Sequence, residues 1–301
     1  MRFSLSVVVL ISVIVWFAAP SPGCAQERAV EEEKSGQNRV AVLIGNAKYE
    51  ASNLGADFVA LKVLTNPCND IQRISAVLER NGWNRETEII EVCDASRSKV
   101  RDAIDQFKDI YLANPKSFGF IYYSGHGIQI GNETYLFGVD SAINLKKAAE
   151  LATSHPEGNI FRGGVRLFHD IISQVGDAGS GSIFVIIDAC RETPIDQYIK
   201  ANGNTPAEFM PQNYPEPVMG VKLLFSTAYG KLASDGATSG SPFALVLEEK
   251  LKQYGNVDLL VSHVIRSVKE KTRNSSIKQV PDTSGSLNPP PPEACLTKCG
   301  D

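Results

Sequence analysis

Two side chains that together support nucleophilic catalysis follow two apolar segments of this sequence. Cys190 comes shortly after the apolar run 183–187. His126 comes shortly after the aromatic-rich run 118–123. A cysteine thiolate is a strong nucleophile, and a nearby base such as imidazole generates it. If the two runs are neighbouring strands, imidazole and thiol share one crevice. A lone buried cysteine is more often structural, but two strand ends that carry both halves of a dyad indicate catalysis.

The elements that position this pair are predicted to form an α/β fold. Unbroken apolar runs are typical of strands buried on both faces of a parallel sheet. Strands are predicted at 39–44, 88–92, 118–123, 183–187 and 221–226, with a hairpin at 127–130 and 134–137. Helical apolar spacing predicts helices at about 69–81, 96–112, 165–175, 242–252 and 257–272. Residues 53–66 are expected to form a loop.

Strands that alternate with helices indicate a mostly parallel central sheet with helices on both faces. Ligands bind such sheets beyond the carboxyl ends of the strands. His126 and Cys190 both stand at such ends, so the predicted fold places a site there.

The composition is that of an ordinary globular protein and gives no indication of nucleic-acid binding. The chain has 301 residues, of which 43% are hydrophobic and 21% charged, and its formal net charge is −4. The sequence lacks the basic excess or stripe that nucleic-acid recognition requires. No internal repeat is found, and the length accommodates one large or two small domains.

The first 25 residues have the pattern of a signal peptide. Arg2 supplies a positive charge, residues 4–19 are apolar and uncharged, and small residues at 23–25 suit cleavage after Ala25. The mature chain is then expected to be exported, either periplasmic or secreted, and free of the membrane. One alternative is retention of the segment as a membrane anchor, although it is short for a span. The other is a lipoprotein site at Gly23-Cys24, for which the preceding Ser21-Pro22 is unfavourable. Residues 26–38 are polar and are predicted to be a flexible lead-in.

Six motifs, in order, resemble those of the caspase-like cysteine peptidases of the caspase/metacaspase family, and most closely bacterial metacaspase-like proteins. They are RVAVLIGN at 39–46, NPCND at 66–70, YYSGHG at 122–127, DACR at 188–191, STAYGKLASDG at 226–236 and SPF at 241–243. The resemblance spans residues 39–285 and implies a caspase-like three-layer sandwich that hydrolyses peptide bonds. Caspases place the histidine about 50 residues before a Q-A-C-[RQG]-G motif. Here the spacing is longer, and Asp188 stands where that glutamine would be.

The resemblance assigns catalytic roles to three residues. Cys190 matches the nucleophile, and His126 matches the general base and acid. The backbone N–H groups of Gly127 and Cys190 match the oxyanion hole, whose donors must be fixed in advance where negative charge develops. Metacaspases often need calcium. The sequence has no ordered acidic loop of the EF-hand kind, so Ca²⁺ activation is expected by analogy only, and the chemistry requires no metal or cofactor.

Charge predicts the side chain preferred at P1, the residue before the scissile bond. Asp188 lies two residues before the nucleophile on the same side of the strand end, and Asp70 and Ser124 match metacaspase positions that line the P1 pocket. Two carboxylates favour arginine, through a bidentate pair, and then lysine. The expected partners are therefore peptides or proteins cut after Arg or Lys, and not after Asp. A plain helix N-cap explains Asp70 equally well.

Two further residues are weaker candidates. In the family, the strand that leads to Ser226 pairs with the extended substrate, although an ordinary edge strand is the alternative. Residues 193–217 form a Pro-rich loop, at the place where the large and small parts of the family join and are often cut. Lys200 is the only basic residue in that loop and a candidate for autoprocessing, whereas a merely mobile loop is the simpler explanation.

The remaining cysteines are compatible with disulfides in an oxidising compartment. The expected pairs are Cys68 with Cys93 and Cys295 with Cys299, and the alternative is that all are reduced. Residues 286–301 are predicted to form a Pro-rich tail. The predicted organisation is a signal peptide (1–25), a lead-in (26–38), a caspase-like peptidase domain (39–285) and this tail.

The function expected from these residues is that of a cysteine endopeptidase. The alternative is a catalytically weak caspase-like scaffold or a peptide-binding protein, and the presence of both His126 and Cys190 argues against it. A thiol-redox function is not indicated, because the sequence contains no C-x-x-C.

Overall fold

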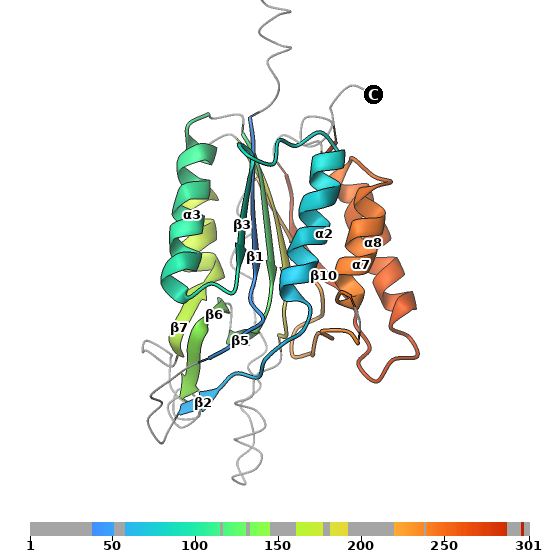
Figure 1. The fold of residues 1–301 in the computed structure, drawn as a ribbon. Helices are drawn as coiled ribbons and strands as arrows, with labels where there is room; N and C mark the ends of the chain where they lie inside the picture. The colour runs from blue at the N-terminus through green and yellow to red at the C-terminus, as the bar shows by residue number, and fades with distance from the viewer. Residues whose placement is uncertain are drawn as a thin grey trace, which may run out of the picture. The chain divides into compact units, whose positions relative to one another are not determined.

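A six-stranded sheet forms the centre of the fold (Figure 1). Its strand order is β10-β9-β8-β4-β1-β3. The bounds are β1 (Arg39–Gly45), β3 (Ile89–Cys93), β4 (Phe118–Ser124), β8 (Ser182–Asp188), β9 (Val221–Phe225) and β10 (Asp282–Gly285). All neighbours pair in parallel except β10, which runs antiparallel to β9. Every residue of β4 and β8 is buried, which is why their sequences are unbroken apolar runs.

This computed structural model describes residues 38–50, 58–114, 117–130, 133–144, 161–176, 181–191, 220–237, 239–287 and 296–297. These residues belong to one compact unit, Gln37–Asp301. The predicted signal peptide, almost all of the lead-in, the 193–217 loop with Lys200, and both Cys295 and Cys299 lie outside the described residues.

Helices cover both faces of the sheet (Figure 1). One face carries α3 (Arg97–Leu112), with the π-helical turn η1 (Leu167–Ile172) and the short α5 (Ser173–Gly176). The other face carries α2 (Pro67–Arg80), α7 (Pro242–Leu251) and α8 (Val257–Lys271). The predicted α/β three-layer sandwich is therefore confirmed.

Alternate residues of the central strands enter two separate cores. Tyr122 and Ile186 pack with the core of α2, α7 and α8. Tyr123 and Ile187 point to the other face and pack with the core of α3 and η1. Each such side chain contributes about 1.5–3 kcal/mol when fully buried. The two cores fix the register of β4 against β8, because a slip of one residue would turn every side chain to the wrong face.

A second, smaller sheet begins directly after His126. It contains β2 (Phe58–Ala60), β5 (Gly127–Ile130) and β6 (Glu133–Asn144), and β7 (Phe161–Arg166) pairs with β6. β5 and β6 are antiparallel, as the predicted hairpin requires. Its turn, residues 131–132, lies outside the described residues.

Three predictions about elements are wrong in part, and one strand of the central sheet was missed. The predicted loop 53–66 contains the strand β2, which pairs with β6. The predicted helix 165–175 begins two residues late, because Val165 and Arg166 complete β7. β10 was not predicted, because its sequence DTSG carries no apolar pattern. The first helix begins at Pro67 rather than near Asn69, since proline favours the first helical position.

A disulfide joins Cys68, in the first turn of α2, to Cys93, at the end of β3. The first of the two expected pairs is thus present in the structure. None of the described helices combines the length and the apolar character that crossing a membrane requires.

Candidate active site

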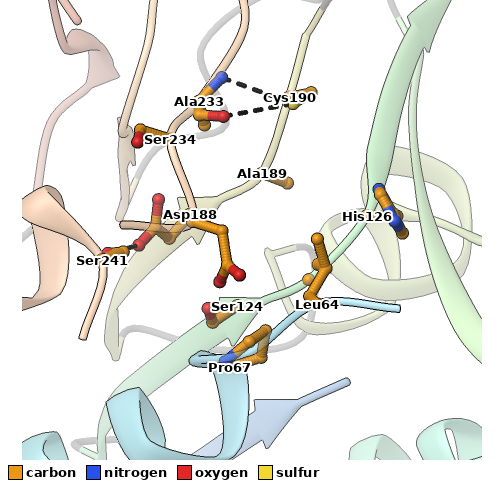
Figure 2. Close-up of a pocket in the computed structure, with 12 residues that line it drawn as sticks. Leu64, Pro67, Ser124, His126, Asp188, Ala189, Cys190, Ala233, Ser234 and Ser241 are labelled. Carbon is orange, nitrogen blue, oxygen red and sulfur yellow. Dashed lines mark hydrogen bonds between the residues drawn. The ribbon is translucent and has the colours of Figure 1, made fainter. Parts of the chain in front are cut away.

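The strand ends that carry His126 and Cys190 are neighbours. β4 and β8 pair in parallel, with Ser124 opposite Asp188. His126 lies two residues after Ser124, and Cys190 lies two residues after Asp188. The N–H of Gly125 donates to the carbonyl oxygen of Asp188 at 3.2 Å. Both candidate side chains line one pocket at the carboxyl end of the sheet (Figure 2).

The backbone around Gly127 lies very close to that around Cys190. A Cβ atom at Gly127 would stand 2.8 Å from Cβ of Ala189 and 3.3 Å from the carbonyl oxygen of Cys190. Only glycine permits this approach. The two backbone segments predicted to supply the oxyanion hole are therefore in contact.

The Cys190 thiol is half-buried and lies against the backbone of Ala233 (Figure 2). Sγ accepts from the Ala233 N–H at 3.4 Å and lies 3.6 Å from the Ala233 carbonyl oxygen, to which the thiol donates. Ala233 belongs to the loop after β9, so this loop passes directly over the thiol.

A backbone carbonyl holds the imidazole of His126. Nε2 of His126 lies 2.7 Å from the carbonyl oxygen of Lys62. A carbonyl only accepts, so Nε2 carries the proton, and Nδ1 of the neutral ring is the atom that accepts one. Burial lowers the pKa of His126 below its ordinary value, while the Lys62 carbonyl and Asp235 act in the opposite direction. The ring is therefore neutral at neutral pH, as a general base must be.

Two buried carboxylates, Asp70 and Asp188, meet beside the pocket, where Ser241 contacts both and Ser124 contacts Asp70. Ser124 Oγ donates to Asp70 Oδ2 at 3.0 Å, and the Ser241 N–H donates to Asp70 Oδ1 at 3.0 Å. Ser241 Oγ donates to Asp188 Oδ2 at 2.5 Å. Ser241 is also the N-cap of α7, since its hydroxyl accepts from the Ala244 N–H. The partly positive helix N-terminus thus faces the acidic pair.

The alternative of a helix N-cap role for Asp70 is wrong. α2 begins at Pro67 with Asn66 at the N-cap position, so Asp70 lies inside the first turn. Its carboxylate is directed to Ser124 and Ser241, and it is fully buried.

The acidic pair holds protons more tightly than ordinary carboxyls do. Burial raises the pKa of Asp70 to about 8, and the nearby charge of Asp188 adds to the effect. Burial also raises the pKa of Asp188 to about 6, against the lowering effect of the Ser241 hydroxyl. Both shifts have the same cause, because a buried negative charge without a cation nearby is costly. A positively charged ligand beside the two carboxylates would stabilise their ionised forms.

Asp235 is a third acidic residue of the site, and sequence reasoning missed it. It lines the pocket with Asp188. Its Oδ2 accepts from the Thr65 N–H at 2.7 Å and its Oδ1 from the Asn66 N–H at 3.1 Å. It thereby ties the loop after β9 to the segment that precedes α2. The available signal was the acidic residue at the end of the motif STAYGKLASDG. The Lys62 contact had no signal, because a backbone carbonyl is independent of residue type.

The strand before Ser226 has no free edge. β9 pairs with β8 on one side and with β10 on the other, so it is not an edge strand, and it has no open side along which a substrate strand could pair. Ser226 is fully buried and is not one of the described residues that line the pocket. Its hydroxyl helps to lower the pKa of Asp188 but makes no hydrogen bond of normal geometry to a described atom.

Arg191, directly after the nucleophile candidate, is fully buried and joins three elements. Nε donates to Gln129 Oε1 of β5 at 2.7 Å, and Nη1 donates to Asp282 Oδ2 of β10 at 2.9 Å. Its guanidinium lies 4.1 Å from the ring centroid of Phe225 on β9. These contacts attach the edge strand β10 to the backbone that carries Cys190.

One group of potential metal ligands occurs among the described residues, formed by Cys68, Cys93 and Asp94. The two sulfur atoms are bonded to each other, so neither offers a thiolate. This group lies outside the pocket lining.

The fold is that of a caspase-like peptidase. A family model described as the caspase domain matches residues 38–290, which is most of the chain, so the chain belongs to the caspase-domain family of cysteine peptidases. It is also similar to mucosa-associated lymphoid tissue lymphoma translocation protein 1 of Homo sapiens, with 26% identity over 106 residues. That match covers 35% of this chain and 11% of the human protein. The chain therefore matches only a small part of that relative.

Proposed function

We propose that this protein is a cysteine endopeptidase that uses Cys190 and His126 and prefers arginine, then lysine, at P1. The observation that carries the proposal is one pocket lined by a half-buried thiol, a neutral imidazole and the carboxylates of Asp188 and Asp235. Family membership supports the peptidase class. The charge of the pocket supports the P1 preference.

In the proposed mechanism, His126 accepts the thiol proton at Nδ1 as Cys190 Sγ attacks the substrate carbonyl carbon. Backbone N–H groups of Gly127 and Cys190 stabilise the resulting oxyanion. His126 then gives its proton to the leaving amine, the C–N bond breaks, and a thioester remains. Water, deprotonated by His126, attacks the thioester and releases the acid and the thiol. The chemistry needs no metal or cofactor, and Ca²⁺ stays a candidate activator by analogy only.

The P1 side chain is proposed to bind above the acidic pair. Burial and neighbouring negative charge raise the pKa of Asp70 and of Asp188, and an arginine guanidinium would supply a positive charge that offsets both effects. Its planar fork also matches a carboxylate better than a lysine ammonium does. An aspartate at P1 would instead add a negative charge to the carboxylates already there. Binding of a basic substrate is therefore expected to release protons.

We propose that the segment 233–235, rather than the strand before Ser226, pairs with the substrate backbone. Ala233, Ser234 and Asp235 all line the pocket. Ala233 already offers an N–H and a carbonyl oxygen beside Sγ of Cys190. The backbone N–H and carbonyl groups of an extended peptide would form hydrogen bonds with these groups of Ala233.

We also propose that the mature chain works in an oxidising compartment outside the cytoplasm. The Cys68–Cys93 disulfide supports this, because disulfides persist in exported proteins and are rare in reducing cytosol.

The test is hydrolysis of fluorogenic peptides that differ only in Arg, Lys or Asp at P1, with and without calcium. The chain without residues 1–25 is compared with its Cys190→Ala variant. We expect cleavage after Arg, less after Lys and none after Asp, with all activity lost in Cys190→Ala.

Cleavage only after Asp would overturn the acidic P1 pocket and leave the nucleophile standing. Cleavage that survives Cys190→Ala would overturn the dyad. No cleavage in any condition would contradict the endopeptidase and favour the scaffold alternative.

A further inference from the structure

We propose that Tyr49 and Tyr123 form a hydrogen-bonded pair that positions His126 by holding both polar groups of its backbone. This inference rests on the proposed function, because it assigns two positioning residues to the proposed general base. Neither tyrosine touches the reacting atoms in the proposed mechanism.

The two hydroxyls contact the backbone of His126 from both ends of the residue. The His126 N–H donates to Tyr49 Oη at 2.7 Å. Tyr123 Oη donates to the His126 carbonyl oxygen at 2.7 Å. The two phenol oxygens lie 3.4 Å apart. Together these contacts make a closed ring of hydrogen bonds through one residue.

The number of available protons determines which group donates in each hydrogen bond of the ring. Tyr123 has one phenol proton, and its two carbonyl neighbours, His126 and Phe137 at 3.0 Å, can only accept it. The Phe137 N–H donates to Tyr123 Oη at 3.1 Å. Tyr49 accepts from the His126 N–H, so its own proton is directed to Tyr123 Oη. Each hydroxyl therefore both donates and accepts, and removing either one opens the ring.

Gly125 has no side chain, and this leaves room for both tyrosine hydroxyls. A Cβ atom at this position would stand 2.7 Å from the Tyr123 hydroxyl oxygen and 2.8 Å from that of Tyr49. Any side chain here would displace the pair. Gly125 lines the pocket, and the two tyrosines explain why this position carries no side chain.

Tyr49 also contacts the imidazole itself. The two ring centroids lie 4.7 Å apart at an interplanar angle of 58°. Tyr49 is almost completely buried, so it shields one side of His126 from water. This burial contributes to the lowered pKa of His126.

The segment that carries Tyr49 is itself fixed at several points. Asp94 Oδ1 accepts from the N–H groups of Ala47 and Lys48, at 2.8 and 2.9 Å. The carbonyl of Ala47 accepts from the Leu64 N–H at 2.9 Å, two residues after the Lys62 carbonyl that holds Nε2. Two stretches that this hydrogen bond joins, residues 47–49 and 62–64, thus hold the backbone and the ring of His126.

Both phenols stay protonated wherever the enzyme would be assayed, because burial raises the pKa of Tyr49 and of Tyr123 well above the ordinary value. They act as fixed donors and acceptors, not as acids. A displacement of about 1 Å of a catalytic group can cost a factor of about 100 in rate. The expected consequence of opening the ring is therefore a loss in kcat.

The test compares Tyr49→Phe, Tyr123→Phe and the double variant with the wild type. Tyr111→Phe is the matched control, because it removes a buried phenol from α3, outside the site. Two quantities are measured for each protein. The first is kcat and KM for an Arg P1 peptide. The second is the rate of Cys190 alkylation by iodoacetamide at pH 7, read by mass spectrometry of the Cys190 peptide.

We expect kcat to fall about 10- to 100-fold in each single variant while KM stays within about threefold. The kcat of the double variant is expected to lie within about threefold of the kcat of the less active single variant, because either change opens the same ring. Alkylation of Cys190 is expected to slow at least about threefold, since the base that takes the thiol proton is misplaced. Tyr111→Phe is expected to match the wild type.

Three results would overturn the tyrosine pair: kcat within about twofold of Tyr111→Phe, losses that multiply in the double variant, or a rise confined to KM. If the wild type cleaves no peptide, the proposed function fails, and the alkylation rates still decide the pair. If Tyr123→Phe does not fold, Tyr49→Phe decides alone, because it opens the same ring.

Discussion

The carbonyl oxygen of Lys62 lies 2.7 Å from Nε2 of His126, and this contact assigns the ring proton to Nε2. Nδ1 is then the nitrogen that accepts a proton. The tautomer is thus set by a part of the chain that carries no catalytic side chain.

The first prediction concerns the pH dependence of kcat. His126 has to be neutral to accept a proton, and burial lowers its pKa below the ordinary value of 6.5. We therefore expect the midpoint of the acid-side decline in kcat for an Arg P1 peptide to lie below pH 6.5. A decline in kcat that is already complete at pH 6.5 would contradict a buried, neutral base.

The second prediction concerns stability and the acidic pair. The raised pKa of Asp188, about 6, means that the folded protein binds a proton more tightly than the unfolded chain does. Its stabilising effect is present at low pH and is lost as pH rises through about 6. We expect Asp188→Asn to gain stability relative to the wild type between pH 5 and pH 8, by about 1.5 kcal/mol, because the rest of the linkage lies below pH 5.

Thermal unfolding of both proteins at the two pH values measures this difference. Comparing the variant with the wild type removes the contribution of His126, whose lowered pKa acts in the opposite direction. Asp258→Asn, at an exposed surface ion pair, is the control and is expected to show no such gain. If the Asp188→Asn variant instead loses stability relative to the wild type between pH 5 and pH 8, the pKa of Asp188 is not raised in the folded protein.

The third prediction separates Asp235 from Asp188. Asp235 lines the pocket and also holds the Thr65 and Asn66 N–H groups, close to the Lys62 carbonyl. We expect Asp235→Ala to raise KM for an Arg P1 peptide and to lower kcat, each about 10-fold or more. Asp188→Asn is expected to act mainly on KM. An Asp235→Ala variant with unchanged kcat would show that its loop contacts do not position His126.

The fourth prediction concerns the disulfide. Cys68 and Cys93 close a loop with a sequence separation of 25, for which the chain-entropy model gives about 3.5 kcal/mol. We expect a dithiol reductant to lower the free energy of unfolding in urea by about that amount. The Cys68→Ala/Cys93→Ala variant is expected to be equally destabilised and insensitive to the reductant. Equal stability with and without reductant in the wild type would mean that the bond does not form in solution.

The central strands could be predicted from sequence because burial on both faces leaves a direct trace in residue type. β4 and β8 are continuous apolar runs, and their parallel pairing follows from the helices between them. The acidic character of the pocket was likewise visible in Asp188, a carboxylate directly after a buried run.

β10 could not be predicted, because its position depends on tertiary contacts rather than on its own residues. Its Asp282 is held by Arg191, which follows Cys190 in the sequence but is remote from β10 along the chain. Because β10 was not predicted, the sequence left one side of β9 open, and the resemblance to the family then made Ser226 a candidate substrate contact.

The supporting contacts of His126 were invisible for a related reason. The Lys62 carbonyl has no residue-type signature, and the role of Tyr49 appears only when β1, the segment after it and the end of β4 are brought together. Sequence patterns report what each element buries, whereas these contacts arise between elements.

The most direct test of the central claim is covalent labelling by peptide chloromethyl ketones that differ only in arginine or aspartate at P1. The thiolate of a nucleophilic cysteine displaces chloride and forms a C–S bond. We expect the arginyl reagent to label Cys190 alone and the aspartyl reagent to fail. Labelling should vanish in Cys190→Ala and slow strongly in His126→Ala. Labelling at another residue, or an aspartyl reagent that reacts as fast as the arginyl one, would contradict a Cys190 nucleophile in an acidic pocket.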